Sequence, residues 1–383
     1  MGFGRIGQAL AHRCLGFEAN IYVYDPFVNK QSIESKNCRK IEFDEGLSIA
    51  DFISIHMPLN NETNRLISKD QFLLMKKECI LVNTARGGII DEEALVWALK
   101  NKKIYVAPMM QYTDKHDRFF LRLISKNVVL FTEMIPTNAI IYGDQKKLLG
   151  YNSKEHPIIL QVGGSKPKEI AKCAKIAKTL FNYDEININV GCPSKKVENG
   201  MFGVCLMNKP FLVGKCIKEI KKNSKIPVSV KCRIGLGEKQ NYLFLKKFIS
   251  YVSKDGCNKF FIHARNAILS KFNPKKNRTI PSLNYKFVYK IKKDFPHLEI
   301  IINGGIDSVP SIQNHLKFVD GVMIGREIYK NPFFLKEIEE KIFNNKVKTT
   351  RKEILEKLVS YIENEIEENQ TSIQSITRHT FGL

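Results

Sequence analysis

The feature that most constrains the fold of this chain is a repeat of short, β-branched apolar segments, each followed by a stretch with helical periodicity. The repeat begins near Tyr105 and occurs eight times before residue 326. Alternating strands and helices favour a parallel sheet, and eight such units predict a TIM barrel within an α/β chain. The predicted strands are residues 105–109, 128–132, 157–161, 185–190, 227–233, 260–263, 299–303 and 321–325.

Polar residues or glycines end almost every predicted strand, and in a barrel these carboxyl ends form the rim where active sites lie. Gly304-Gly305 and Gly325-Arg326 follow the last two strands, where barrels bind phosphate groups. Lys231 and His263 would face the same cavity, and a nearby cation suits the electron-rich ring of a reduced flavin. Together these signals predict an FMN barrel, although each alone also fits an ordinary turn or a structural histidine.

The first hundred residues carry a different pattern. Gly2-Phe-Gly4-Arg-Ile-Gly7 leads into a helical stretch, and Asp25 ends the following strand-like segment. This order of glycine turn, helix, strand and acidic residue is that of a dinucleotide site, with the pyrophosphate at the helix N-terminus and Asp25 on the ribose hydroxyls.

The net charge of +22 is distributed unevenly along the chain. Residues 1–104 contain 14 Lys and Arg against 13 Asp and Glu, whereas residues 105–383 contain 47 against 26. An excess of this size attracts polyanions, and nucleic acid is the commonest such partner. A lysine-rich, solvated surface without a partner remains the alternative at this point.

Nine cysteines are spread over the sequence without a C-x-x-C pair. An odd number at these spacings indicates neither a disulfide framework nor a metal site, so we expect a reducing, cytoplasmic compartment and no bound metal. The first twenty residues resemble no signal peptide, and no apolar run approaches the length of a membrane span. We therefore expect no association with a membrane.

The barrel segment resembles the tRNA-dihydrouridine synthases of the A type over residues 105–383. The motifs occur in order, and each falls at a predicted rim position. They are Ala107-Pro-Met-Met-Gln-Tyr-Thr-Asp114, Thr132-Glu-Met, Leu160-Gln-Val-Gly-Gly164, Ile188-Asn-Val-Gly-Cys-Pro-Ser194, Asn199-Gly-Met-Phe-Gly203, Lys231-Cys-Arg-Ile-Gly, Ile262-His-Ala-Arg-Asn266, Asn273-Pro-Lys-Lys-Asn-Arg278 and Ile302-Asn-Gly-Gly305.

This resemblance implies an oxidoreductase that reduces the 5,6-double bond of uracil at positions 20 and 20a of the tRNA D-loop, using FMN that NADPH reduces in turn. It implies Cys192 as the proton donor and Asn189, Lys275 and Arg278 as tRNA contacts. The residues that it implies for FMN are Pro108, Met109, Met110, Gln161, Lys231, His263, Asn303, Gly304, Gly305, Gly325 and Arg326.

The chemistry expected of Cys192 is consistent with its place in the sequence. Hydride transfer to one carbon of the double bond leaves an enolate-like carbon that an acid must protonate, and a cysteine thiol keeps its proton near neutral pH. Cys192 lies between Gly191 and Pro193 on a predicted rim loop, whereas the other eight cysteines lack such flanking residues. A uridine in folded RNA must also be flipped out to reach a barrel mouth.

The first hundred residues resemble the coenzyme domain of the D-2-hydroxyacid dehydrogenases. The resemblance rests on the glycine turn, Asp51-Phe-Ile-Ser-Ile-His-Met-Pro-Leu, Asn60-Asn-Glu-Thr and Leu81-Val-Asn-Thr-Ala-Arg-Gly-Gly-Ile-Ile-Asp91, and it implies that Arg86 binds a substrate carboxylate. The leading strand and the segments that carry that family's catalytic Glu and His are not found. We therefore expect an inactive, dispensable remnant whose glycine turn has no sheet edge to anchor it.

The predicted organisation is a partial Rossmann fragment (1–104), an FMN barrel (105–335) and the start of a helical tRNA-binding domain (336–383). Because every rim signal precedes residue 335, flavin binding is expected to need nothing beyond it. Binding of tRNA is expected to be weak and salt-sensitive, since the helical resemblance stops partway. Two other functions stay open, an FMN barrel that reduces a free pyrimidine and an inactive chimera, and the sequence does not predict the oligomeric state.

Overall fold

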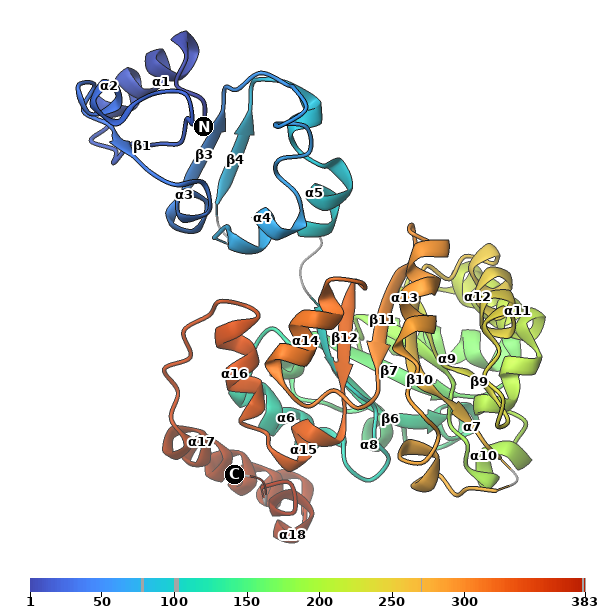
Figure 1. Cartoon of the computed structure of the whole chain (residues 1–383). Coiled ribbons are helices and arrows are strands. Elements are labelled where there is room, and N and C mark those ends of the chain that lie inside the picture. Colours follow the sequence, from blue (N-terminus) through green and yellow to red (C-terminus); the bar gives the residue numbers. More distant parts are fainter. Residues whose placement is uncertain (77–78, 100–102, 270, 381, 383) are drawn as a thin grey trace. The chain divides into compact units, whose positions relative to one another are not determined.

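The computed structural model describes residues 1–76, 79–99, 103–269, 271–380 and 382. The chain divides into two compact units, Met1–Asn101 and Lys102–Leu383 (Figure 1). Strand β5 of the second unit already begins at Lys103, whose backbone pairs with Gly321. The boundary predicted near residue 104 therefore lies inside the first strand of the second unit.

The first unit contains two parallel two-stranded sheets, β1–β2 and β3–β4, with helices between the strands. Its elements are α1 (Arg5–Leu15), β1 (Tyr22–Val23), α2 (Lys30–Glu34), β2 (Arg39–Lys40), α3 (Phe43–Ile49), β3 (Phe52–Ile55), α4 (Lys69–Leu74), β4 (Ile80–Asn83), the 3₁₀ turn η1 (Gly87–Ile89) and α5 (Glu92–Leu99). One apolar cluster, which includes Leu47, Ile55 and Ile67, packs against β3–β4, and a smaller one around Ile33 packs against β1.

The glycine turn of this unit is anchored between the two sheets. The Gly2 amide donates to the Tyr24 carbonyl at 3.0 Å, the Met1 carbonyl accepts from the His56 amide at 2.8 Å, and the Met1 amine donates to the Ser54 carbonyl at 2.9 Å. The expectation of an unanchored turn was therefore wrong, because two residues are enough to bridge the strands.

Eight parallel strands form the barrel predicted for the second unit, so the predicted fold class is confirmed. In the order of the sheet they are β5 (Lys103–Val106), β12 (Gly321–Ile324), β11 (Glu299–Asn303), β10 (Lys259–Ala267), β9 (Val228–Leu236), β8 (Glu185–Val190), β7 (Ile158–Gly163) and β6 (Leu130–Pro136). The Val106 amide donates to the Val129 carbonyl, and the Val129 amide donates to the Ile104 carbonyl, both at 2.9 Å. These bonds join β5 to the segment that leads into β6 and close the sheet.

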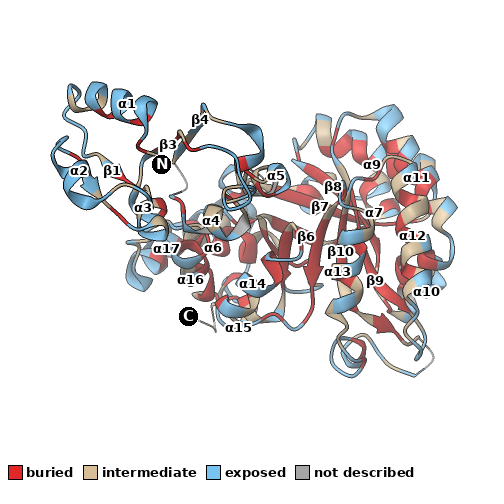
Figure 2. Ribbon diagram, turned by 45° about the horizontal axis from the view of Figure 1, so that its top comes forward, coloured by how far each residue is buried: buried red, intermediate tan, exposed pale blue. Residues whose placement is uncertain are grey.

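Helices cover the outside of the barrel, and the strands are buried (Figure 2). The helices are α6 (Lys115–Ile124), α7 (Thr137–Tyr142), α8 (Gln145–Leu149), α9 (Pro167–Thr179), α10 (Lys195–Asn199), α11 (Pro210–Asn223), α12 (Tyr242–Lys254), α13 (Tyr285–Asp294), α14 (Val309–Leu316), α15 (Arg326–Lys330) and α16 (Phe334–Lys341), with 3₁₀ turns η2 (Ser153–Glu155), η3 (Gly203–Asn208) and η4 (Lys276–Arg278). Every residue of β7 and β8 is buried, as expected of strands covered on both faces.

The C-terminal segment continues along the barrel wall. On α16, Leu335 and Ile338 join the main apolar core, and the Glu339 carboxylate accepts from the Ser125 hydroxyl and the Asn127 amide. Helix α17 (Arg351–Asn369) packs on α6 through Tyr361, whose ring stacks on Phe119 at a centroid distance of 3.9 Å, and α18 (Ile373–Thr377) follows. Helix α16 thus spans the boundary predicted at residue 335 and packs as part of the barrel wall.

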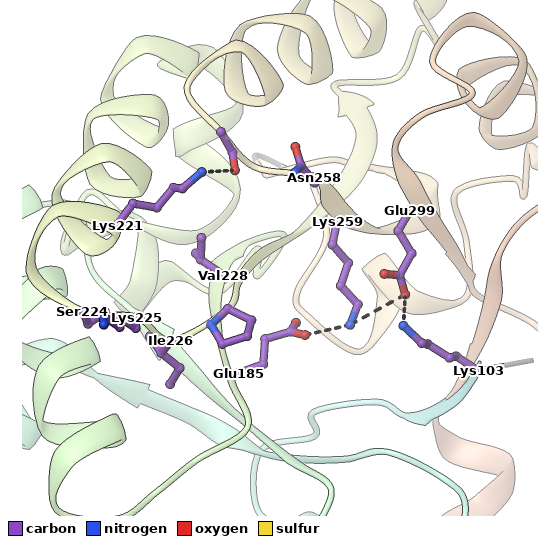
Figure 3. A pocket seen from close by; sticks show the side chains of 12 residues that line it. Lys103, Glu185, Lys221, Ser224, Lys225, Ile226, Val228, Asn258, Lys259 and Glu299 are labelled. Carbon is purple, nitrogen blue, oxygen red and sulfur yellow. Dashed lines mark hydrogen bonds and ion pairs between the residues drawn. The ribbon is translucent and has the colours of Figure 1, made fainter. Parts of the chain in front are cut away.

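A network of charged side chains, of which Lys259 and Glu185 are the most buried, lies at the amino-terminal end of the barrel (Figure 3). Lys259 Nζ lies 2.7 Å from Glu185 Oε2 and 3.8 Å from Glu299 Oε1, and Lys103 Nζ lies 3.1 Å from Glu299 Oε1. These residues line a cavity of about 630 Å³ at the end of the barrel opposite the predicted rim. This cluster could not be predicted from the sequence, because each member starts a different strand.

Candidate active site

The predicted site residues lie at the carboxyl ends of β5 and of β7 to β12, which are neighbours in the sheet, and in the loops that follow. In the sheet register Asn189 of β8 pairs with Lys231 of β9, and His263 of β10 pairs with Asn303 of β11. Gln161 lies on β7, and Gly325 follows β12 directly. Residues far apart in sequence are therefore brought to one end of the barrel.

A chain of amide side chains crosses the strands at the rim. Asn189 Nδ2 donates to Gln161 Oε1 at 2.8 Å, and Gln161 Nε2 donates to Asn187 Oδ1 at 2.8 Å. Asn189 Oδ1 also accepts from the Gly191 and Cys192 amides, at 3.1 and 2.9 Å. Asn189, for which the resemblance implies a tRNA contact, is thus buried and shapes the Cys192 loop.

The loop that carries Cys192 is held on its other side by Arg233. The Arg233 guanidinium, which is almost fully buried, donates to the carbonyls of Gly191, Asn266 and Asn277 at 3.0, 2.9 and 2.9 Å. One side chain therefore fixes the Cys192 loop to the end of β10 and to η4. The burial of Arg233 lowers its pKa to about 10.

Packing also restricts the Cys192 loop. The Val204 amide donates to the Cys192 carbonyl at 3.1 Å. Gly203 has a positive φ of 68°, and a Cβ there would lie 2.8 Å from the Cys192 carbonyl oxygen. Only glycine fits this close approach.

Lys231 is the cation of the site. Its Nζ donates to Asn303 Oδ1 at 3.1 Å, and burial, assisted by the nearby Arg233, lowers its pKa to about 8. The same two causes hold the pKa of His263 well below its usual value. At neutral pH Lys231 is therefore charged and His263 is neutral, so the positive charge expected at this cavity comes from Lys231 and not from His263.

The glycines after β11 form a tight turn against His263. Gly304 and Gly305 have φ values of 116° and 69°, and a Cβ on Gly304 would lie 2.7 Å from His263 Cδ2. The Tyr285 hydroxyl donates to the Gly304 carbonyl at 2.8 Å and fixes the turn. Such a turn leaves backbone amides open to a close ligand.

Two further segments complete the rim. A Cβ on Gly325 would lie 3.7 Å from Met109 Sδ, so the loop with Pro108, Met109 and Met110 adjoins the turn after β12. Arg326 Nη2 donates to the Arg278 carbonyl at 3.4 Å, which joins this turn to η4. Met110 is 54% exposed and is available to a partner in solution.

The predicted RNA contacts Lys275 and Arg278 lie at η4 and are exposed. Their loop is held by Asn277, whose side chain donates to the Phe272 carbonyl at 2.8 Å and accepts from the Ile268 amide at 2.8 Å. Sequence reasoning named the two cations but not the two tethers, Arg233 and Asn277. The signal for Arg233 was its place two residues after Lys231, on the same face of a predicted strand.

Among the described residues, no helix is long and apolar enough to cross a membrane. The same residues contain no group of three or more His, Cys, Asp or Glu side chains with the geometry to hold a metal ion.

Comparison with known families decides the identity of the second unit. Residues 105–383 match the family model described as dihydrouridine synthase. The chain belongs to the dihydrouridine synthase family. As a member it is an oxidoreductase, and the resemblance seen in the rim motifs is confirmed.

Curated relatives support the same assignment. The chain is 48% identical over 283 residues to tRNA-dihydrouridine(20/20a) synthase of Vibrio cholerae, covering 73% of this chain and 86% of that protein. It is 49% identical over 280 residues to the enzyme of the same name from Escherichia coli, covering 73% and 80%.

The first unit matches a second family. Residues 1–115 match the model described as D-isomer specific 2-hydroxyacid dehydrogenase, NAD binding domain, so the resemblance found in the sequence is confirmed. An apo-structure of D-lactate dehydrogenase from Escherichia coli is 29% identical over 34% of this chain and 40% of that chain, with a TM-score of 0.25. In the structure Asp25 accepts from the Phe3 and Phe27 amides, and Arg86 is exposed.

Proposed function

We propose that this dihydrouridine synthase reduces uridines 20 and 20a in the D-loop of tRNA, with FMN as its cofactor and NADPH as the reductant. The proposal rests on the arrangement of side chains and backbone at the rim of the barrel. A thiol on a loop fixed by Asn189 and Arg233 lies at the same rim as a half-buried cation, Lys231, and a glycine turn after β11.

The residues at the rim fit a flavin mononucleotide. Gly304 needs to lack a Cβ, because one would collide with His263, and both glycines of the turn have positive φ. The open backbone of this turn, with Gly325 and Arg326 beside it, suits a phosphate group. Lys231 provides a positive charge for the pyrimidine edge of a reduced isoalloxazine ring.

The proposed cofactor contacts divide between the two ends of FMN. Gly304, Gly305, Gly325 and Arg326 would hold the phosphate. The ring would lie against the remaining rim residues, which are Pro108, Met109, Met110, Gln161, Lys231, His263 and Asn303. Neutral His263 can donate one hydrogen bond without adding charge, so the positive potential around it comes from Lys231 and the neighbouring arginines, Arg233 among them.

The reaction adds two electrons and two hydrogens to the 5,6-double bond of uracil. A bound reduced flavin supplies a hydride to carbon 6. Cys192 donates the proton to carbon 5, and its thiolate regains a proton from water. Asn189 holds the Cys192 amide and Arg233 holds the Gly191 carbonyl, so the thiol is positioned before the uridine arrives.

Binding of tRNA is proposed to use the basic surface of the second unit. Lys275 and Arg278 lie on a loop tethered to the Cys192 loop through Arg233, so a phosphate bound there is fixed relative to the thiol. Because neutralisation of phosphates releases counterions, affinity for tRNA is expected to fall steeply with salt.

A first test of the cofactor uses Lys231→Met. At pH 7 we expect the FMN dissociation constant, measured by quenching of flavin fluorescence, to rise about tenfold, as for the loss of one charge-assisted contact. In the wild type the ammonium is present below a pKa of about 8, so affinity for anionic FMN should fall as pH rises through that value. The variant should show no such dependence between pH 7 and pH 9.

The control for this test is Lys271→Met, which removes a cation whose ion pair with Glu238 is exposed. Its FMN affinity should match that of the wild type. An unchanged dissociation constant and pH profile in Lys231→Met would remove Lys231 from the flavin site.

A second prediction concerns the first unit. Shortening the chain to residues 103–383 should leave FMN affinity and dihydrouridine formation unchanged, because the rim contacts described above lie within the second unit. The full chain should oxidise no 2-hydroxy acid with NAD. Loss of FMN binding by the shortened chain, measured by the same titration, would show that residues 1–102 contribute to the working fold.

A further inference from the structure

The end of the chain makes a buried polar contact with the start of α6. His379 Nε2 lies 3.0 Å from Asp114 Oδ2, and Arg378 Nη2 lies 2.5 Å from the same oxygen. The His379 side chain is 1% exposed. These two residues follow α18, 265 and 264 positions after Asp114, and sequence patterns gave no sign that they meet.

Asp114 connects this contact to the loop proposed to hold FMN. It is the N-cap of α6, where its carboxylate accepts from the His116 and Asp117 amides at 3.0 Å each. It is also the residue at which the loop from Pro108 to Thr113 ends. Burial opposes the charge of this carboxylate, but hydrogen bonds from His379 and Arg378 hold its pKa well below the usual range.

The same pair reaches the other side of the proposed phosphate site through Tyr329. The Tyr329 hydroxyl donates to the Arg378 carbonyl at 3.3 Å, and the Tyr329 and His379 rings meet edge to face at 5.9 Å. Tyr329 lies on α15, which starts directly after Gly325, and its ring packs on Tyr112 at 4.4 Å. The two segments that flank the proposed phosphate site are thus both in contact with the end of the chain.

The loop from Met109 to Tyr112 has a backbone conformation that contacts with neighbouring residues must maintain. Gln111 has φ of 68°, in the left-handed region that non-glycine residues rarely adopt. Its amide donates to the Glu133 carboxylate, and the Met109 amide donates to Thr113 Oγ1 at 3.0 Å. A strained loop of this kind keeps its shape only while both ends are fixed.

We propose that Arg378 and His379 are positioning residues for the flavin site, where the Met109–Tyr112 loop adjoins the Gly325 turn. They fix Asp114 and Tyr329, and through these residues they hold the Met109–Tyr112 loop against the Gly325 turn. The proposal rests on the proposed function, since it concerns affinity for FMN. It also replaces the expectation that flavin binding needs nothing beyond residue 335.

The test compares full-length His379→Ala and Asp114→Asn with the wild type. Asn at position 114 can still cap α6 but carries no charge to pair with Arg378. For each variant we expect the FMN dissociation constant, from fluorescence titration, to rise about tenfold. The double variant should be no weaker than either single variant, because both changes remove the same interaction. His379→Gln, which restores a donor, should recover part of the affinity.

The matched control is Lys115→Met. Lys115 neighbours Asp114 on α6 and joins this helix to α17 through an ion pair of 2.6 Å with Glu365, away from the loop. Its loss should lower the thermal midpoint of the apoprotein to a similar extent as His379→Ala, with FMN affinity unchanged.

The possible outcomes separate the two claims. Wild-type affinity in both His379→Ala and Asp114→Asn would overturn the positioning role and leave the proposed function intact. An equal loss of affinity in Lys115→Met would show that the effect is general destabilisation, and would also overturn it. A wild-type protein that binds no FMN would refute the proposed cofactor, and this proposal with it.

Discussion

Replacement of Cys192 by alanine is expected to lower the rate of dihydrouridine formation by about 10²–10⁴-fold, the usual contribution of a positioned general acid. The flavin should stay bound, because the thiol donates to none of the groups proposed to hold FMN. The rate at which NADPH reduces the flavin should equal that of the wild type. It can be measured anaerobically from the decrease in the visible absorbance of the flavin. Only the formation of dihydrouridine should then be impaired, as measured by mass spectrometry of tRNA nucleosides.

The matched control is Cys205→Ala, a partly buried cysteine on η3. It should form dihydrouridine at the wild-type rate. Full product formation by Cys192→Ala would remove Cys192 as the acid, and failure of both variants to bind flavin would indicate a folding defect.

Lys259→Met is expected to be the most destabilising single change at the amino-terminal end of the barrel. The Lys259 ammonium compensates Glu185, whose side chain is 9% exposed, and lies 5.0 Å from the Tyr105 ring centroid. Its removal leaves the buried Glu185 carboxylate without its ion-pair partner, whereas Glu299 keeps Lys103, at a cost of roughly 3–5 kcal/mol in the free energy of unfolding. Urea denaturation and the thermal midpoint measure this loss.

The pH dependence of this loss follows from Glu185. Burial already raises its pKa, and Lys259 is the main influence that lowers it. Without Lys259 the folded-state pKa rises further, so the destabilisation should be larger at pH 8 than at pH 5, where the carboxyl can be neutral. Lys271→Met, which removes an exposed pair, should unfold like the wild type. A Lys259→Met protein as stable as the control at pH 8 would show that Lys259 does not compensate the charge of Glu185.

The strands of the barrel could be predicted because almost every apolar segment ends in a polar residue or a glycine. The predicted ends of β9 and β10 were too early, since pairing continues beyond the rim through Asn266 with Gly235 and Ala267 with Leu236. Those residues look like loop in the sequence, because nothing local distinguishes a strand that rises above the rim.

The sequence indicates the candidate site residues one by one, but it does not show the hydrogen bonds that connect them. Lys231, His263 and Cys192 stand out because each has a chemistry that a barrel rim can use. The role of Arg233 could not be predicted, since it binds backbone carbonyls 33 to 44 positions away that carry no sequence signal. The contact of His379 with Asp114 was missed for the same reason.

In the first unit the sequence pattern could be identified, but the contacts that anchor it could not be predicted. The resemblance of this unit to the coenzyme domain of the D-2-hydroxyacid dehydrogenases was identified correctly from the glycine turn and Asp25 together with later motifs, and the family match agrees. The bridging role of Met1 and Gly2 could not be predicted, because two residues are too short to show the alternation by which strands are recognised.

The central claim is tested most directly by incubating the purified full chain with FMN, NADPH and tRNA that lacks dihydrouridine. The account predicts a gain of two hydrogens at uridines 20 and 20a, located by mass spectrometry of nuclease fragments, with no conversion of free uracil under the same conditions. Reduction of free uracil with tRNA left unchanged would contradict it, as would oxidation of NADPH by the flavoprotein with no change in the mass of tRNA.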